Sequence, residues 1–181
     1  AVKNGWHVCS FLYTRGRPLS GWAEGLLGAV RTDVNYELSV ELMEELSGKT
    51  DASELMAVIA MRDDDAAKLQ LSANPVLALF DRPSNRGNLG TVIRSCDALG
   101  VECLAVTGHG VDPYDPDTVV STMGSFFKVP VLRMADNRTV EGFIEKLRAD
   151  YPAIRVVGTS AHAELEMFDV DLAGPVLFLI G

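Results

Sequence analysis

The sequence lacks any long hydrophobic run. Its longest apolar segments, Val76–Phe80 and Val176–Ile180, are far shorter than the roughly 18 residues that a membrane-spanning helix needs. It also lacks the pattern of a signal peptide, because the first residues include Lys3, Asn4 and His7 and no extended apolar core follows them. We therefore expect a cytoplasmic protein with no membrane partner.

Cysteine is scarce. The three cysteines, Cys9, Cys96 and Cys103, are an odd number and show no spacing typical of metal ligands. They lie on or near apolar segments, which favours buried, reduced thiols over disulfides or a zinc site. The sequence therefore predicts no metal centre.

Positive charge is also in deficit. The net charge is −9, which argues against bulk electrostatic binding of nucleic acid, because such binding usually needs a basic face. One stretch departs from this balance: Asp81–Arg94 holds three arginines and one aspartate, a local net charge of 3 − 1 = +2. A small basic site on an acidic body can still hold a phosphate.

Apolar, β-branched strands alternate with helices in residues 75–181. This alternation predicts an α/β fold, a mostly parallel sheet with helices on both faces. We expect strands at Val76–Phe80, Cys103–Thr107, Val129–Met134, Arg155–Ser160 and Val176–Ile180, and helices at Gly90–Leu99, Asp115–Met123 and Arg138–Ala149.

A smaller α/β domain is expected to precede this one, in residues 1–62. Its strands are predicted at His7–Tyr13, Val34–Leu38 and Leu55–Met61, and its helices at Ser20–Val30 and Val40–Leu46. Residues 63–74 start with acidic residues and continue with small and polar ones, so we expect a linker there.

The Asp81–Arg94 loop has two interpretations. It is rich in turn residues and can be a plain connection, with Arg94 paired to Asp97 three residues on. Alternatively it is a ligand site at the carboxyl end of a parallel strand. Gly87 and Gly90 would let the backbone approach a ligand, and a helix N-terminus at Gly90 would favour an anion. Arg94 points away from the apolar helix face, free for a phosphate, a ribose hydroxyl or a partner subunit.

A second group of polar residues lies between residues 121 and 130. A helix ending at Gly124, with the following aromatic residues packed on the sheet, explains much of this segment. It explains less well why Ser121, Ser125 and Lys128 gather beside the entrance to a strand.

Four short motifs stand out in residues 76–181: Asn88-x-Gly90-x-x-x-Arg94, Ser121-x-x-Gly124-Ser125, Val157-Gly158-Thr159 and Leu179-Ile180-Gly181. In these motifs the segment resembles the SpoU/TrmH branch of the SPOUT methyltransferases, which are RNA ribose 2'-O-methyltransferases. Residues 1–62 are similar to the family's small substrate-RNA-binding domain. Within the family the chain is most similar to ribosomal RNA enzymes of the antibiotic-resistance type.

The resemblance implies S-adenosylmethionine as cofactor, ribosomal RNA rather than transfer RNA as substrate, and a homodimer when the protein is complete. Arg94 would orient the hydroxyl and stabilise developing negative charge, and Asn88 would shape that site. The implied cofactor contacts are Gly158, Thr159, Ile180 and Gly181. The implied RNA contacts are Arg82, Arg86, Ser121, Ser125 and Lys128.

One departure from the family pattern is large. The family's second signature continues beyond the Gly181 position with a glutamate, and a third, S-L-N-V-S-like signature threads a trefoil knot. Because neither is present, we expect an α/β-knot fold truncated before the knot is completed, inactive alone. The alternative is a catalytically silent α/β module that binds RNA or protein, and the complete reading frame would discriminate between the two.

Overall fold

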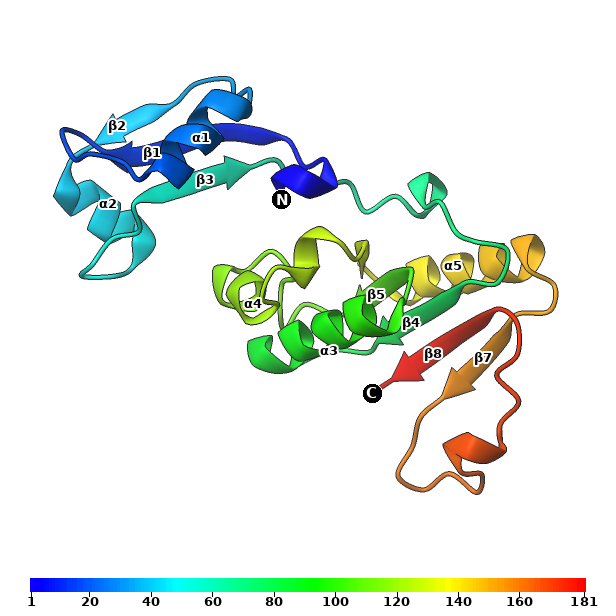
Figure 1. The fold of residues 1–181 in the computed structure, drawn as a ribbon. Coiled ribbons are helices and arrows are strands. Elements are labelled where there is room, and N and C mark those ends of the chain that lie inside the picture. Colours follow the sequence, from blue (N-terminus) through cyan, green and yellow to red (C-terminus); the bar gives the residue numbers. More distant parts are fainter. The chain divides into compact units, whose positions relative to one another are not determined.

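The computed structural model describes all 181 residues and divides into two compact units (Figure 1). The first unit is Ala1–Arg62 and the second is Asp63–Gly181. None of the helices combines the length and the apolar character that a membrane crossing requires.

The first unit is a three-stranded sheet with two α-helices. Its central strand, β1, is parallel to β2 and antiparallel to β3. Each helix begins after a serine, Ser20 or Ser39, whose hydroxyl oxygen accepts a hydrogen bond from a backbone N–H in the first turn. Phe11 and Met43 are buried in its core. The elements are η1 (Val2–Asn4), β1 (Val8–Thr14), α1 (Gly21–Ala29), β2 (Tyr36–Leu38), α2 (Val40–Ser47) and β3 (Leu55–Ile59).

The second unit contains a five-stranded sheet in the order β6-β5-β4-β8-β7, with every neighbouring pair parallel. Leu77 of β4 lies beside Cys103 of β5 on one side and Leu177 of β8 on the other. The predicted parallel sheet is therefore confirmed. Its strands are β4 (Val76–Phe80), β5 (Cys103–Thr107), β6 (Val131–Met134), β7 (Arg155–Gly158) and β8 (Val176–Ile180).

Helices cover both faces of this sheet (Figure 1). Alternate residues along the strands point to opposite faces, so Leu77 and Leu177 pack with Phe143 and Leu147 of α5 on one face, and α3 lies over the other. The helical elements are η2 (Ala66–Lys68), α3 (Arg86–Leu99), α4 (Pro116–Ser121), η3 (Ser125–Phe127), α5 (Asn137–Asp150) and η4 (Met167–Asp169).

The start of α3 corrects a prediction. The sequence placed the helix N-terminus at Gly90, but α3 begins at Arg86 after the cap residue Asn85, whose side chain accepts a hydrogen bond from the Asn88 N–H. Gly90 is therefore an interior helical residue, not an anion-binding terminus. Its small size serves close packing against Ser121 of α4, rather than the approach of a ligand to the backbone.

Other differences are small. β6 begins at Val131, after a proline that has no N–H for the ladder, and β7 ends at Gly158. Residues 63–74, expected as a linker, lie along the second unit. Leu69 and Leu71 pack against its core, and Asp64 accepts hydrogen bonds from the backbone N–H and the Nε of Arg133. Two leucines among polar residues were too weak a pattern to indicate this docking.

Candidate active site

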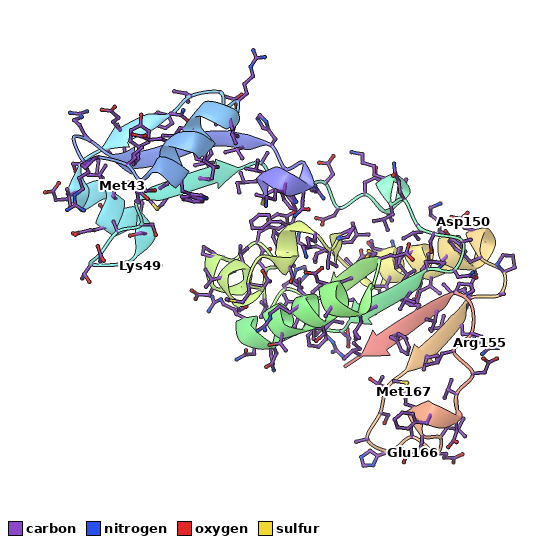
Figure 2. The ribbon with its side chains drawn as sticks, viewed as in Figure 1. Met43, Lys49, Asp150, Arg155, Glu166 and Met167 are labelled. Carbon is purple, nitrogen blue, oxygen red and sulfur yellow. The ribbon has the colours of Figure 1, made fainter.

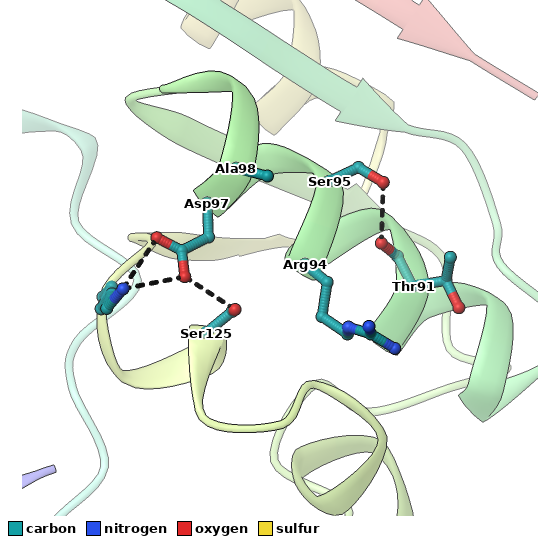
Figure 3. A pocket seen from close by; sticks show the side chains of 7 residues that line it. Thr91, Arg94, Ser95, Asp97, Ala98 and Ser125 are labelled. Atoms are coloured by element: carbon teal, nitrogen blue, oxygen red, sulfur yellow. Dashed lines mark hydrogen bonds and ion pairs between the residues drawn. The ribbon is translucent and has the colours of Figure 1, made fainter.

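Arg94 lies on the outward face of α3, because the same helix buries Leu89, Ile93 and Cys96. It lines an open pocket of about 520 Å³ with Thr91, Ser95, Asp97, Ala98, Ser125 and Lys128 (Figure 3). The Arg94 side chain makes no hydrogen bond or ion pair and is exposed. Its guanidinium is therefore available to a ligand, as the interpretation of the Asp81–Arg94 loop as a ligand site requires.

Asp97 is engaged elsewhere and does not pair with Arg94. Its carboxylate accepts a hydrogen bond of 2.7 Å from the Ser125 hydroxyl, and its two oxygens lie 3.2 and 3.3 Å from the Lys128 ammonium. The hydrogen bond from Ser125, opposed by partial burial and assisted by Lys128, holds the pKa of Asp97 below its ordinary value. The alternative of an Arg94–Asp97 surface pair is therefore wrong.

The hydroxyls on the α3 side of the pocket are already bonded within the helix. Thr91 donates to the Gly87 carbonyl over 2.9 Å, and Ser95 donates to the Thr91 carbonyl over 3.1 Å. Two cations, Arg94 and Lys128, and one anion, Asp97, remain as the charged groups of the lining, a net charge of 2 − 1 = +1. A pocket of this kind suits a phosphate or another anion.

The other two arginines of the Asp81–Arg94 stretch are paired. The Arg86 Nε lies 2.9 Å from a carboxylate oxygen of Asp115. Arg82 forms an ion pair of 2.7 Å with Asp81, and its backbone N–H donates to the Thr107 hydroxyl, which in turn donates to Asp81 over 2.5 Å. These bonds, from Arg82 first and then Thr107, lower the pKa of Asp81. Of the three arginines, only Arg94 has no acidic partner.

Two of the predicted site residues, Ser121 and Asn88, do not line the Arg94 pocket. Ser121 is half-buried against Gly90, and its hydroxyl donates to the Thr118 carbonyl over 2.7 Å. Asn88 is exposed in the first turn of α3, where its backbone N–H completes the cap. The structure thus places Arg94, Ser125 and Lys128 in one pocket, whereas Ser121 lies outside its lining, in the contact between α3 and α4.

The predicted cofactor residues lie at the carboxyl ends of two neighbouring strands, β7 and β8. Gly158 pairs with Leu179 of β8, Ile180 is the last residue of that strand, and Gly181 follows it. Both the N–H and the hydroxyl of Thr159 donate to the Leu179 carbonyl, over 2.9 and 3.1 Å. β8 lies between β7 and β4 and is parallel to both, so the carboxyl ends of these three strands lie at the same edge of the sheet.

A second hollow, of about 680 Å³, lies beside the end of β7. Its lining includes Gly158 and Thr159, apolar side chains such as Leu165 and Met167, and two carboxylate residues, Glu164 and Glu166. The volume is within the usual range of small-molecule sites, and the mixed lining suits a ligand with both a ring system and polar groups. Ile180 and Gly181 are not part of this lining.

One group of residues that could hold a metal ion lies in the first unit. The donor atoms of His7, Cys9 and Asp33 are all within 4.8 Å of one another, and the backbone N–H of Asp33 donates to the Cys9 carbonyl over 2.9 Å. The spacing of residues in the sequence did not indicate this group, because Asp33 lies in a loop and is 24 residues from Cys9 along the chain. Cys96 and Cys103 are buried as expected, and burial raises the pKa values of their thiols to about 11 and about 12.

The second unit matches a known family over almost its whole length: residues 75–181 match the SpoU rRNA Methylase family. The chain belongs to this family.

Several relatives are similar over most of the chain. The 23S rRNA (uridine(2479)-2'-O)-methyltransferase of Streptomyces viridochromogenes is 41% identical over 100% of the chain and 63% of the relative. The 23S rRNA (guanosine(2553)-2'-O)-methyltransferase RlmP of Bacillus subtilis is 30% identical over 69% of the chain and 46% of the relative. The chain thus spans less than two thirds of the length of either relative.

Solved structures agree with this assignment. The SpoU methyltransferase AviRb from Streptomyces viridochromogenes, in complex with AdoMet, superposes with a TM-score of 0.92 at 41% identity, over 99% of this chain and 68% of that one. An rRNA methyltransferase from Sinorhizobium meliloti gives a TM-score of 0.81 at 25% identity, over 99% of this chain and 66% of that one.

Proposed function

We propose that this protein transfers a methyl group from S-adenosylmethionine to a ribose 2'-hydroxyl of RNA. The observation that carries the proposal is the state of Arg94, an exposed guanidinium without an acidic partner, in a pocket that also holds Lys128. Relatives that act on the 2'-oxygen of 23S rRNA support the same chemistry.

Arg94 is the residue proposed to act on the acceptor hydroxyl. A guanidinium stays protonated in proteins, so Arg94 serves as a donor, not as a base. It orients the hydroxyl and stabilises the negative charge that develops on the oxygen as the proton leaves. Asn88, exposed six residues earlier in α3, is proposed to complete this site. When bound, S-adenosylmethionine supplies the activated methyl group.

Residues of this chain fit part of a cofactor site. We propose that Gly158 and Thr159 border the cofactor in the hollow beside β7, where apolar side chains suit an adenine ring and Glu164 suits ribose hydroxyls. Because the Thr159 N–H and hydroxyl are bonded to Leu179, this residue contributes its shape and carbonyl rather than these donors. Ile180 and Gly181 are proposed to border the cofactor from the adjacent strand end.

Ribosomal RNA is proposed as the substrate, because the relatives with the three longest alignments act on 23S rRNA. Lys128 and Ser125 would contact the RNA within the Arg94 pocket, and Arg82, Arg86 and Ser121 would border the path of the strand. Residues 1–62 are proposed to bind substrate RNA. A homodimer is also proposed, because the Arg94 pocket is open and a second subunit could cover it.

The test is methyl transfer by the full-length protein with tritiated S-adenosylmethionine. Transcripts of 23S rRNA and of tRNA are offered separately. We expect label in the 23S transcript, in a dinucleotide that resists alkaline hydrolysis, since a methylated 2'-oxygen cannot attack the neighbouring phosphate. No label in either transcript, with RNA binding retained, would favour the catalytically silent module instead.

A further inference from the structure

We infer that Asp97 is a positioning residue of the proposed methyl-transfer site, one that touches no RNA itself. It holds Lys128 and Ser125 at the pocket so that Lys128 and Arg94 together receive one phosphodiester of the substrate. The inference rests on the proposed function and adds a residue and a phosphate site to it.

The contacts identify Asp97 as the fixed member of the group. Its side chain is 22% exposed, whereas that of Lys128 is 60% exposed. The Ser125 hydroxyl donates to Oδ2 over 2.7 Å, and both carboxylate oxygens lie within 3.3 Å of the Lys128 Nζ (Figure 3). A largely enclosed acid thus anchors the more exposed side chain of a lysine that lines the pocket.

The anchoring leaves donors for a ligand. A lysine ammonium has three N–H groups, and a single carboxylate at these distances cannot satisfy all of them. At least one remains directed away from Asp97. Because lysine loses considerable rotamer entropy when it is fixed by a ligand, holding it in advance reduces that part of the binding cost.

The same contacts keep Arg94 available. Asp97 follows Arg94 by three residues on α3, a spacing that permits a side-chain ion pair on a helix surface. Ser125 and Lys128 instead occupy the carboxylate, so the guanidinium is not neutralised. The pocket therefore presents two cations, one of them anchored, and a phosphodiester would complete its charge balance.

The experiment compares wild-type full-length protein with Asp97→Asn, an isosteric change that removes the charge. For methylation of a 23S rRNA transcript we expect KM to rise about tenfold, as for loss of one charge-assisted contact, with kcat within about threefold of wild type. Lys128→Ala should raise KM similarly. The double variant should be no worse than Lys128→Ala alone, because both changes remove one interaction.

A matched control is available in α5. Asp150, near the end of α5 (Figure 2), forms an exposed ion pair of 2.8 Å with Lys146, and α5 packs on the opposite face of the sheet from α3 and its pocket. Asp150→Asn removes the same charge from the same kind of pair, and it should leave KM and kcat unchanged. If Asp97→Asn does not fold, Asp97→Glu takes its place, because it retains the charge but displaces it by one methylene, and a smaller rise in KM is expected.

Failure of this inference and failure of the proposed function give different results. An Asp97→Asn protein with a lower melting temperature but unchanged KM would mean that Asp97 only ties α3 to η3, and the inference would be wrong. A fall in KM would mean that the acid opposes RNA binding, which also overturns it. Absence of methylation by wild-type protein would instead contradict the proposed function itself.

Discussion

Gly90 of α3 lies directly against Ser121 of α4. A Cβ atom added at position 90 would stand 1.8 Å from the Ser121 Oγ and 2.7 Å from its Cβ. Glycine is otherwise a poor residue for a helix interior, where it costs roughly 1 kcal/mol relative to alanine. Its presence in the middle of α3 is therefore explained by the close approach of the two helices, which also places the Ser121–Lys128 segment beside Arg94.

The first prediction concerns this contact. Gly90→Ala should lower the free energy of unfolding by about 1–3 kcal/mol, because overpacking outweighs the gain in helix propensity. The control is Gly142→Ala in α5, where an added Cβ meets nothing within 4 Å, and a small increase in stability is expected. Urea unfolding of both variants is the measurement. Equal stabilisation by the two substitutions would show that α3 and α4 are not in close contact at Gly90.

A second prediction concerns Arg94. Arg94→Ala should reduce methyl transfer at least about a hundredfold, as for other groups that stabilise transition-state charge. The melting temperature should stay close to that of wild type, because the side chain is exposed and has no partner. Arg94→Lys should recover little, since an ammonium does not reproduce the fork of donors. Single-turnover rates on a 23S rRNA transcript decide it, and near-normal turnover would remove Arg94 from the mechanism.

Part of the fold could be read directly from the sequence. The expected bounds of β4, β5 and β8 match the structure, because each is a run of apolar or β-branched residues bordered by proline, glycine or charged residues. The start of α3 could not be read in this way. Asn85, Gly87 and Asn88 are turn residues by composition, yet here they form a helix cap and a first turn.

The sequence also predicted only part of the candidate site. Helical periodicity alone indicated that Arg94 faces outward, and the structure agrees. The partners of Asp97 could not be predicted, because Ser125 and Lys128 are 28 and 31 residues away and reach it only through the packing of η3 on α3. Likewise, the approach of Asp33 to His7 depends on a loop for which the sequence gives no register.

The third prediction tests the expectation that the protein has no metal centre. His7 and Asp33 are mostly exposed, and with Cys9 they offer three donors where a structural zinc site uses four. We expect dialysis against a chelator to leave the melting temperature unchanged, and zinc addition to raise it by no more than a degree or two. A large zinc-dependent rise that Cys9→Ser abolishes would establish a site in this unit.

A fourth prediction concerns the segment before β4. Asp64 accepts hydrogen bonds of 2.9 Å from the backbone N–H of Arg133 and 2.7 Å from its Nε. Asp64→Ala should cost about 1–3 kcal/mol, the usual range for losing bonds to a charged group. Hydrogen exchange should rise selectively at residues 63–71. Unchanged protection there would mean that Leu69 and Leu71, packed against the core, hold the segment without Asp64.

The last prediction concerns the stability of the fold at acid pH. The pKa values of Asp97 and Asp81 are lowered in the folded protein, by Ser125 first in one case and by Arg82 first in the other. For a carboxyl with a lowered folded pKa, the stabilisation is fully present above the unfolded pKa, about 3.9, and is lost as the pH falls through the folded value. The free energy of unfolding should therefore decline from about pH 5 downward. Asp97→Asn should be less stable than wild type at pH 6. The difference should shrink as the pH falls below about 4, because the carboxyl of the unfolded wild-type chain then takes up a proton while that of the folded chain is still ionised. Urea titrations across that range are the measurement. A difference that stays constant with pH would show that the ionised form of Asp97 contributes nothing to stability.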